Sequence, residues 1–302
     1  MIRYSDIVNI SQSEGFDACG VARPQQLTSN TRRLKEWIDA GNVASLDYMC
    51  RNIDKREDIT QMVEGAKSVI VCAVSYKSDV NSHYTSSTRG KIASYACNGD
   101  YHKTIKKMLL RMLSSLKELY PDVEGRAFVD SAPIFEKQYA VNAGLGWIGR
   151  QSLLVSPTLG TYILLGELVI NCQVDRYDKP IEEVGCAECR RCVEVCPNGA
   201  INANRTIDAR RCISCQTIEQ RNVEGIDLHG WIFGYDECQI CCPYNQKAPN
   251  HKNPNFNPLF SPNAISPEQW LTMSEEEFTS RFGLTPLRRS GLQRIQYNLN
   301  KE

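Results

Sequence analysis

The first 180 residues alternate between helical and strand-like hydrophobic patterns. Apolar residues recur at helical spacing over residues 34–41 and 46–59, so we expect the first 65 residues to be helical. Continuous apolar runs rich in β-branched residues predict buried strands over residues 67–76 and 161–170. These runs are about half the length of a membrane span, which argues against an integral membrane protein.

The most regular amphipathic pattern lies in residues 100–120. Asp100 provides an N-cap for this predicted helix and Pro121 provides a stop. Residues 126–130 predict a short strand, and residues 134–144 predict a helix that ends at a glycine. The alternation of strands and helices predicts an α/β (or α+β) domain over residues 1–180.

Two further segments follow this domain. Residues 181–246 are rich in cysteine and predict a module of their own. Residues 247–302 begin with a stretch rich in Pro and Asn and end in an acidic and then basic helical pattern. We expect this last segment to be a loose tail that packs on the core.

Composition narrows the class of protein. The 302 residues are 42% hydrophobic and carry 35 basic and 35 acidic side chains, as in a soluble globular protein. Zero net charge argues against a generally basic nucleic-acid coat but allows a local patch. The residues after Met1 are too polar for a secretory signal. We therefore expect a reducing cytoplasm, where grouped cysteines act as metal ligands or redox groups.

Nine of the 14 cysteines lie between Cys186 and Cys242. The first four, Cys186, Cys189, Cys192 and Cys196, have the C-x2-C-x2-C-x3-C-P spacing of a ferredoxin that binds [4Fe–4S] clusters. Zinc sites also use C-x2-C pairs, but this tight run ending in Cys-Pro favours iron and sulfur. The segment therefore predicts a bacterial-ferredoxin-like module.

The remaining cysteines provide a second, split set of ligands. In ferredoxins with two clusters, the cysteine before proline ligates the other cluster. This rule assigns Cys186, Cys189, Cys192 and Cys242 to one cluster, and Cys196, Cys212, Cys215 and Cys238 to the other. Eight thiolates are needed, so one of the nine is spare, and we expect it to be Cys241. The five cysteines outside this segment are expected to be core residues.

The segment Gly144–Gly149 matches the dinucleotide fingerprint G-x-G-x-x-G. A dinucleotide site needs a strand before this motif and a helix after it, whereas here a predicted helix precedes it. We expect a tight loop that lets the backbone of Gly144, Gly146 and Gly149 approach another large cofactor. Trp147 is either a core residue or a stacking surface.

Asp130 follows the predicted strand that ends in Phe128 and Val129. One interpretation is a helix cap, a role that Ser131 also suits. The other is a carboxyl group with a raised pKa that donates a proton. Tyr101 and His102, at the start of the predicted long helix, have the same ambiguity.

Several segments together carry a family resemblance. FVDSAPIFEKQYAVNAGLGWIGR (128–150), YACNGDYHK (95–103), LGEL (165–168), CAECRRCVEVCPNGAI (186–201) and PLRRSG (286–291) are similar to the epoxyqueuosine reductases, which are cobalamin-dependent iron–sulfur enzymes that complete queuosine in tRNA. The resemblance runs almost end to end. It implies that the N-terminal domain binds cobalamin and that two [4Fe–4S] clusters deliver electrons to it.

The resemblance also implies roles for individual residues. Asp130 takes the position of the family's general acid, and Tyr101, His102 and the Gly144–Gly149 loop would surround the corrin. The implied partners are tRNA carrying epoxyqueuosine and an electron donor such as a flavodoxin or a ferredoxin, and we expect a monomer. Basic residues that are either tRNA contacts or solvated surface are Lys247, His251, Lys252, Arg288 and Arg289.

The chain departs from the family in a few positions. Tyr235 stands where the family has a cysteine, and Cys215 or Cys241 must replace that ligand. Asn98 stands where glycine is common, and 302 residues leave no room for the C-terminal helical-repeat domain of longer members.

Two alternative functions remain open. A reductive dehalogenase has the same cofactors but carries a twin-arginine leader, which this N-terminus lacks. A simple electron-transfer ferredoxin would leave the 180-residue domain without a task.

Overall fold

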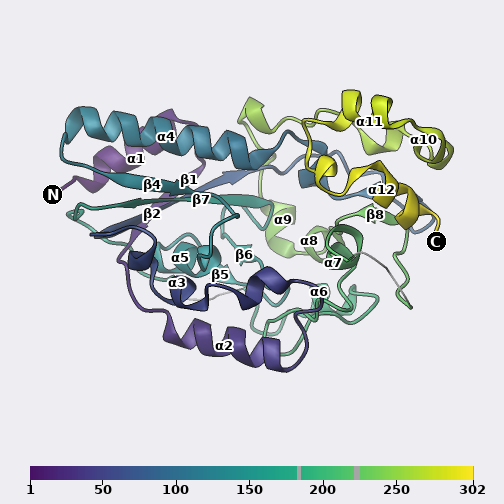
Figure 1. Cartoon of the computed structure of the whole chain (residues 1–302), viewed down its shortest axis with the longest axis horizontal. Coiled ribbons are helices and arrows are strands. Elements are labelled where there is room, and N and C mark those ends of the chain that lie inside the picture. Colours follow the sequence, from purple (N-terminus) through teal and green to yellow (C-terminus); the bar gives the residue numbers. More distant parts are fainter. Residues whose placement is uncertain (182–184, 221–224, 302) are drawn as a thin grey trace.

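The computed structural model describes residues 1–181, 185–220 and 225–301. At its centre lies a four-stranded sheet in the order β1-β2-β7-β4, in which every neighbouring pair is antiparallel (Figure 1). Its strands are β1 (Ala18–Ala22), β2 (Ser68–Ser75), β4 (Gly125–Phe128) and β7 (Ile163–Ile170). The fold is therefore mixed α/β, with an antiparallel sheet.

Three of these strands lie where the apolar runs predict them, but β1 lies in a region expected to be helical. β1 has five residues, Ala-Cys-Gly-Val-Ala, too few and too small to show a period of two. Its strand conformation comes from pairing along its whole length with β2. The expectation of an all-helical N-terminal region was wrong because this pairing is non-local.

Helices cover both faces of the sheet (Figure 1). One face carries α1 (Tyr4–Ser13) and the long α4 (Tyr101–Leu119), and the other carries α2 (Thr28–Asp39), α3 (Ile53–Glu57) and α5 (Glu136–Asn142). β2 is fully buried between them, because Ile70 and Val74 pack toward α4 while Val69 and Val71 pack toward α5. As expected, the side chain of Asp100 caps α4.

In its described residues, the cysteine-rich segment contributes short helices and one strand. The helices are α6 (Arg191–Glu194), α7 (Ile213–Ile218), α8 (Glu237–Ile240) and α9 (Pro243–Lys247). Its strand β8 (Trp231–Phe233) pairs in parallel with β3 (Lys91–Ile92) of the N-terminal domain. The two segments are therefore interlocked rather than joined only end to end.

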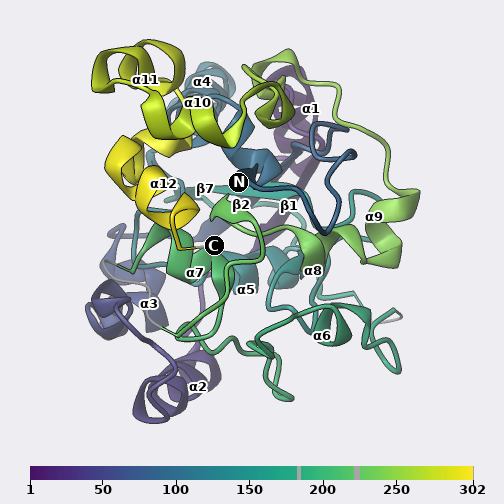
Figure 2. The same ribbon diagram turned by 90° about the vertical axis from the view of Figure 1, so that its right-hand side faces the viewer.

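The C-terminal segment is more ordered than its Pro and Asn content predicts. It contains α10 (Pro267–Thr272), α11 (Glu275–Phe282) and α12 (Gly291–Leu299), which gather on one side of the molecule, with α12 beside α7 (Figure 2). Trp270, Phe282 and Ile295 are fully buried in a core that they share with β8.

The remaining elements are short. A two-stranded pair is formed by β5 (Trp147–Ile148) and β6 (Leu154–Val155). The 3-10 helices are η1 (Asp47–Cys50), η2 (Ile59–Gln61), η3 (Ser94–Cys97), η4 (Pro254–Phe256), η5 (Pro262–Ala264) and η6 (Pro286–Arg289). Within the described ranges, no helix combines the length and the apolar character that crossing a membrane requires.

Candidate active site

A cleft of about 1110 Å³ opens beside the end of β4 and the start of α4. Its lining includes Asp130, His102, Glu136 and Arg289, together with residues of α2 and of the segment after β5. Ligand pockets for small molecules are usually about 300–1,000 Å³. The cleft is therefore large enough for a bulky cofactor, a substrate group, or both.

Asp130 lies in a tight turn just after β4. Its φ of 53° is in the left-handed region, which aspartate tolerates better than most residues. Its backbone N–H donates to Glu136 Oε1 at 2.5 Å, and its side chain is 50% exposed. α5 begins only at Glu136, and no side chain caps it. The helix-cap interpretation of Asp130 was therefore wrong.

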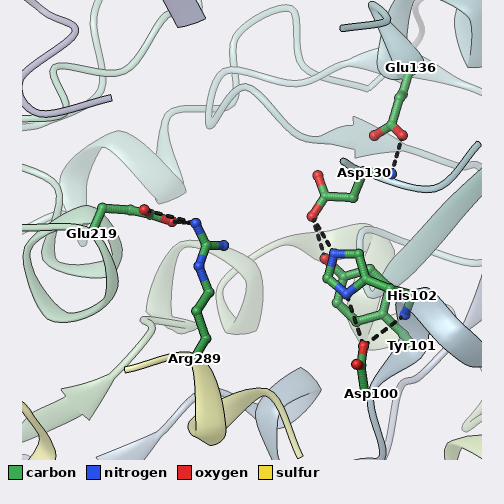
Figure 3. A network of polar contacts seen from close by, with 7 residues as sticks. All are labelled: Asp100, Tyr101, His102, Asp130, Glu136, Glu219 and Arg289. Carbon is green, nitrogen blue, oxygen red and sulfur yellow. Dashed lines mark hydrogen bonds and ion pairs between the residues drawn. The ribbon is translucent and has the colours of Figure 1, made fainter. Parts of the chain in front are cut away.

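Tyr101 and His102 from the first turn of α4 meet the carboxylate of Asp130 (Figure 3). The Tyr101 hydroxyl donates to Asp130 Oδ2 at 2.5 Å, and His102 Nε2 lies 3.2 Å from the same oxygen. His102 Nδ1 lies 3.0 Å from Asp100 Oδ1. The imidazole thus bridges two carboxylates, and it stacks on the Tyr101 ring with 4.1 Å between centroids.

These contacts set the protonation states of the site. The His102 hydrogen bond, and then that of Tyr101, lowers the pKa of Asp130 against the opposing effect of burial. Hydrogen bonds to Asp130 and Asp100 raise the pKa of His102. Burial and the charge of Asp130 raise the pKa of Tyr101. The expectation that Asp130 itself has a raised pKa was wrong, because its neighbours stabilise the carboxylate and hold the protons.

A second carboxyl group lies beneath Asp130, and the sequence analysis missed it. Glu167 on β7 is fully buried, and no donor group among the described residues hydrogen-bonds to either of its side-chain oxygens. The neighbouring carboxyl group of Glu136 can share a proton with it. Burial raises the pKa of Glu167 well above its usual range, and burial followed by the charge of Asp130 raises that of Glu136 to about 7. The signal in the sequence was an acidic residue inside a continuous apolar run.

Arg289 lines the cleft on the side away from Asp130 (Figure 3). Its Nη2 lies 2.7 Å from Glu219 Oε1 and 2.9 Å from Oε2, so this predicted tRNA contact already has an acidic partner. Its charge also helps to lower the pKa of Asp130. Lys247, Lys252 and Arg288 are exposed and do not line the cleft, and His251 is half-buried.

The cleft carries basic side chains that the sequence analysis did not single out. They belong to α2, to the segment around α3, to the first turn of α5, and to the turn that follows α6. These residues are Arg33, Arg51, Arg56, Lys137 and Arg205. Only Asp130 and Glu136 among the lining residues are acidic, so a chain without net charge has a basic cleft.

The structure brings the first set of predicted cluster ligands together. Cys186, Cys189, Cys192 and Cys242 line one small cavity, although Cys242 lies 50 positions or more from the other three in sequence. Burial, and then the three neighbouring thiols, raise the pKa of the Cys192 thiol to about 11. Four thiols around one cavity are the donor set of a cubane cluster.

The second set surrounds Cys212. The pKa of Cys212 is raised by burial and by Cys196, and that of Cys238 is raised by burial and by Cys212. Burial followed by Cys212 raises the pKa of Cys215 to about 12.

Cys241 interacts with thiols of both sets, mainly with those of the first. Burial, and then Cys192, Cys242 and Cys189, raise the pKa of the Cys241 thiol to about 12. Tyr235 lies beside Cys238 and Cys196, which both help to raise its pKa. Tyr235 thus lies next to the second set of cysteines. Cys215 belongs to this set and is available as the thiol that the tyrosine cannot supply.

The Gly144–Gly149 loop packs against the protein's own backbone. A Cβ atom on Gly146 would lie 2.2 Å from the carbonyl oxygen of Val155, and Gly144 has a φ of +72°. Trp147 is 5% exposed, and its indole Nε1 lies 3.5 Å from Cys186 Sγ. Gly144, Gly146, Trp147 and Gly149 do not line the cleft, although Ile148 of the same loop does, and Trp147 lies beside the first cysteine set.

Comparison with known proteins adds independent information. The family model described as "Epoxyqueuosine reductase QueG, DUF1730" matches residues 56–131, and the model described as "4Fe-4S double cluster binding domain" matches residues 185–245. The chain is 37% identical over 99% of its length to an epoxyqueuosine reductase of Cyclobacterium marinum, of which it covers 96%. It is 35% identical over 94% of its length to that of Pseudomonas aeruginosa, covering 80%.

Solved structures agree with the sequence matches. A crystal structure of epoxyqueuosine reductase with an epoxyqueuosine-modified tRNA-Tyr stem loop superposes with a TM-score of 0.87 at 25% identity, over 98% of this chain and 79% of that one. The enzyme of Streptococcus thermophilus superposes with a TM-score of 0.81 at 26% identity, with the same coverage. The fold, the paired cysteine sets and these similarities together show that the chain belongs to the epoxyqueuosine reductase family.

Proposed function

We propose that this protein reduces epoxyqueuosine to queuosine in tRNA, with electrons passing through two [4Fe–4S] clusters to cobalamin in the cleft. The observation that supports the reaction is the convergence of Tyr101 and His102 on one oxygen of Asp130 at the edge of the cleft. Reduction of an epoxide to an alkene consumes two electrons and two protons and releases water. A site for this reaction must therefore hold protons where the oxygen departs.

The cleft fits a large cofactor in size and in polarity. Besides its volume of about 1110 Å³, it contains an unused donor: Arg56 is 8% exposed, and its Nε is buried without a hydrogen-bond partner among the described residues. Such a group favours a ligand that brings hydrogen-bond acceptors. When bound, cobalamin supplies a strongly reducing cobalt centre that acts on the epoxide.

The protein's own residues manage the protons. His102 Nε2 and Tyr101 Oη both lie against Asp130 Oδ2, and the raised pKa of each group favours its protonated form. We infer that Asp130 donates a proton to the departing oxygen after receiving one from His102. Asp100 supports this transfer, because it holds the other imidazole nitrogen at 3.0 Å.

The basic character of the cleft supports tRNA as the substrate. Its lining combines six Lys and Arg side chains with two carboxylates, which favours a polyanion. A related enzyme has been crystallised with an epoxyqueuosine-modified stem loop. Arg289 can contact tRNA only if its ion pair with Glu219 opens on binding. We therefore expect the other basic residues of the cleft to make most of the phosphate contacts.

Asp130→Asn tests the proposed reaction. After anaerobic reconstitution, we expect the variant to keep about eight irons and one corrinoid per chain and to lose about 10²- to 10⁴-fold in turnover of epoxyqueuosine-containing tRNA. Asp122→Asn, at an exposed position, is the matched control and should turn over like wild type. Undiminished turnover of Asp130→Asn refutes the proton role. Iron without corrinoid in the wild-type protein would leave only an electron-transfer function.

A further inference from the structure

The segment from Trp147 to Gln151 covers the first cysteine set. The Trp147 indole Nε1–H donates to Cys186 Sγ at 3.5 Å, in a contact that is buried. Arg150 and Gln151 line the cavity formed by the four thiols. This segment comes from the N-terminal domain, so the cluster site is completed by residues outside the ferredoxin-like module.

Arg150 binds the loop that carries two of the ligands. Its Nε lies 2.8 Å from the carbonyl oxygen of Cys189 and 3.2 Å from that of Cys186, and its Nη2 donates to the carbonyl oxygen of Ala187 at 2.6 Å. These contacts satisfy carbonyl groups that the ligand loop leaves free. They also hold a permanent positive charge next to the thiols, because arginine stays protonated.

The positions of these side chains are fixed by the surrounding packing. Gly146 lies so close to the Val155 carbonyl that no side chain fits there, which anchors the loop directly before Trp147. The Tyr244 ring meets the indole edge-on with 5.1 Å between centroids. The packing around Trp147 therefore aims its donor at the Cys186 sulfur.

We propose that Trp147 and Arg150 raise the reduction potential of the cluster bound by Cys186, Cys189, Cys192 and Cys242. Reduction adds one electron to this cluster and thus one negative charge. A hydrogen bond to a ligating sulfur and a nearby cation both stabilise the more negative state. The proposal rests on the cluster ligation in the proposed function, but not on cobalamin or on the tRNA substrate.

The second cysteine set provides an internal reference. Cys196 Sγ accepts a hydrogen bond from the backbone N–H of Ala200 at 3.2 Å, which side-chain substitutions in the Trp147–Gln151 segment leave in place. A change in Trp147 should therefore separate the potentials of the two clusters.

Trp147→Phe is the test, because phenylalanine keeps an aromatic ring and removes the donor. The reconstituted variant is titrated with dithionite anaerobically, and both clusters are followed by EPR. The hydrogen bond is present in both oxidation states, so only its strengthening on reduction changes the potential. We expect a change of up to about tenfold in the reduction equilibrium, which for one electron is a shift of at most about 59 mV to more negative potential, in one cluster only.

Two further variants complete the experiment. Trp270→Phe is the control, because Trp270 is fully buried and packs on Phe282, in the C-terminal core shared with β8. Arg150→Gln removes the charge and should shift the same cluster in the same direction. Unchanged potentials in both Trp147→Phe and Arg150→Gln overturn the proposal, as does an equal shift of both clusters.

Iron content separates this inference from the proposed function. Loss of about four irons in both variants would make the segment a structural cover and refute the tuning role. If Cys186→Ser retained all eight irons, the ligand assignment itself would be wrong, whatever the potentials of the other variants.

Discussion

Glu167→Gln replaces a fully buried carboxyl group with a neutral amide of nearly the same size. Native Glu167 and Glu136 share a site in which burial raises the pKa of both carboxyl groups. At neutral pH the native pair retains a proton that the same residues release in the unfolded chain. Folding stability should therefore fall as the pH rises above about 4.5, the ordinary pKa of glutamate.

The magnitude follows from linkage. Glu136 reaches a pKa of about 7, and Glu167 is the more deeply buried of the two. Each pH unit over which the native state holds one extra proton costs about 1.4 kcal/mol. Between pH 5.5 and 7.0 this amounts to about 2 kcal/mol, which the glutamine variant avoids. For a protein of this size the difference corresponds to roughly 3 °C in Tm.

The assay is anaerobic thermal unfolding at pH 5.5 and pH 7.0, followed by circular dichroism. We expect the Tm of Glu167→Gln to increase relative to that of wild type as the pH rises. Glu118→Gln, at an exposed position of α4, should follow wild type at both values. If the Tm of Glu167→Gln does not increase relative to that of wild type between pH 5.5 and pH 7.0, native Glu167 does not hold the proton.

Three further outcomes are expected. Asp100→Ala should destabilise the protein by about 1 kcal/mol in denaturant unfolding, because α4 loses its cap. The same variant should lower the pKa of His102 measured by NMR, and an unchanged pKa would contradict the role of His102 as a bridge between Asp100 and Asp130. Turnover should fall as the pH rises through the raised pKa of His102, since the imidazolium then loses the proton that it supplies to Asp130, and a flat alkaline profile would refute this source. Cys215→Ser should cost about four irons while Cys241→Ser retains eight, and the reverse result would exchange their roles.

The sequence predicted elements that depend on local pattern. The strands β2, β4 and β7 and the capped helix α4 follow from apolar runs, β-branched residues and Asp100. The grouping of Cys242 with three distant cysteines followed from the spacing rule of ferredoxins, because cluster geometry restricts how thiolates can be spaced.

The contacts that surround Asp130 could not be predicted in the same way. Glu136 and Glu167 meet because α5 crosses β7, and no local period records that crossing. The reversal of the expected pKa of Asp130 has the same origin, since it depends on which atoms of α4 reach the turn after β4. The contact of Trp147 with Cys186 could not be predicted either, because a glycine motif indicates a close approach but not what approaches.

The parallel pairing of β3 with β8 has a consequence for how the chain is made. β3 is synthesised about 140 residues before its partner, and β8 lies between the cysteines of the second cluster. Contacts of such long sequence separation form late in folding. Metal binding that organises β8 therefore also completes part of the N-terminal domain. In cells short of iron, we expect newly made chains to be degraded as a whole rather than to accumulate as a stable cluster-free enzyme.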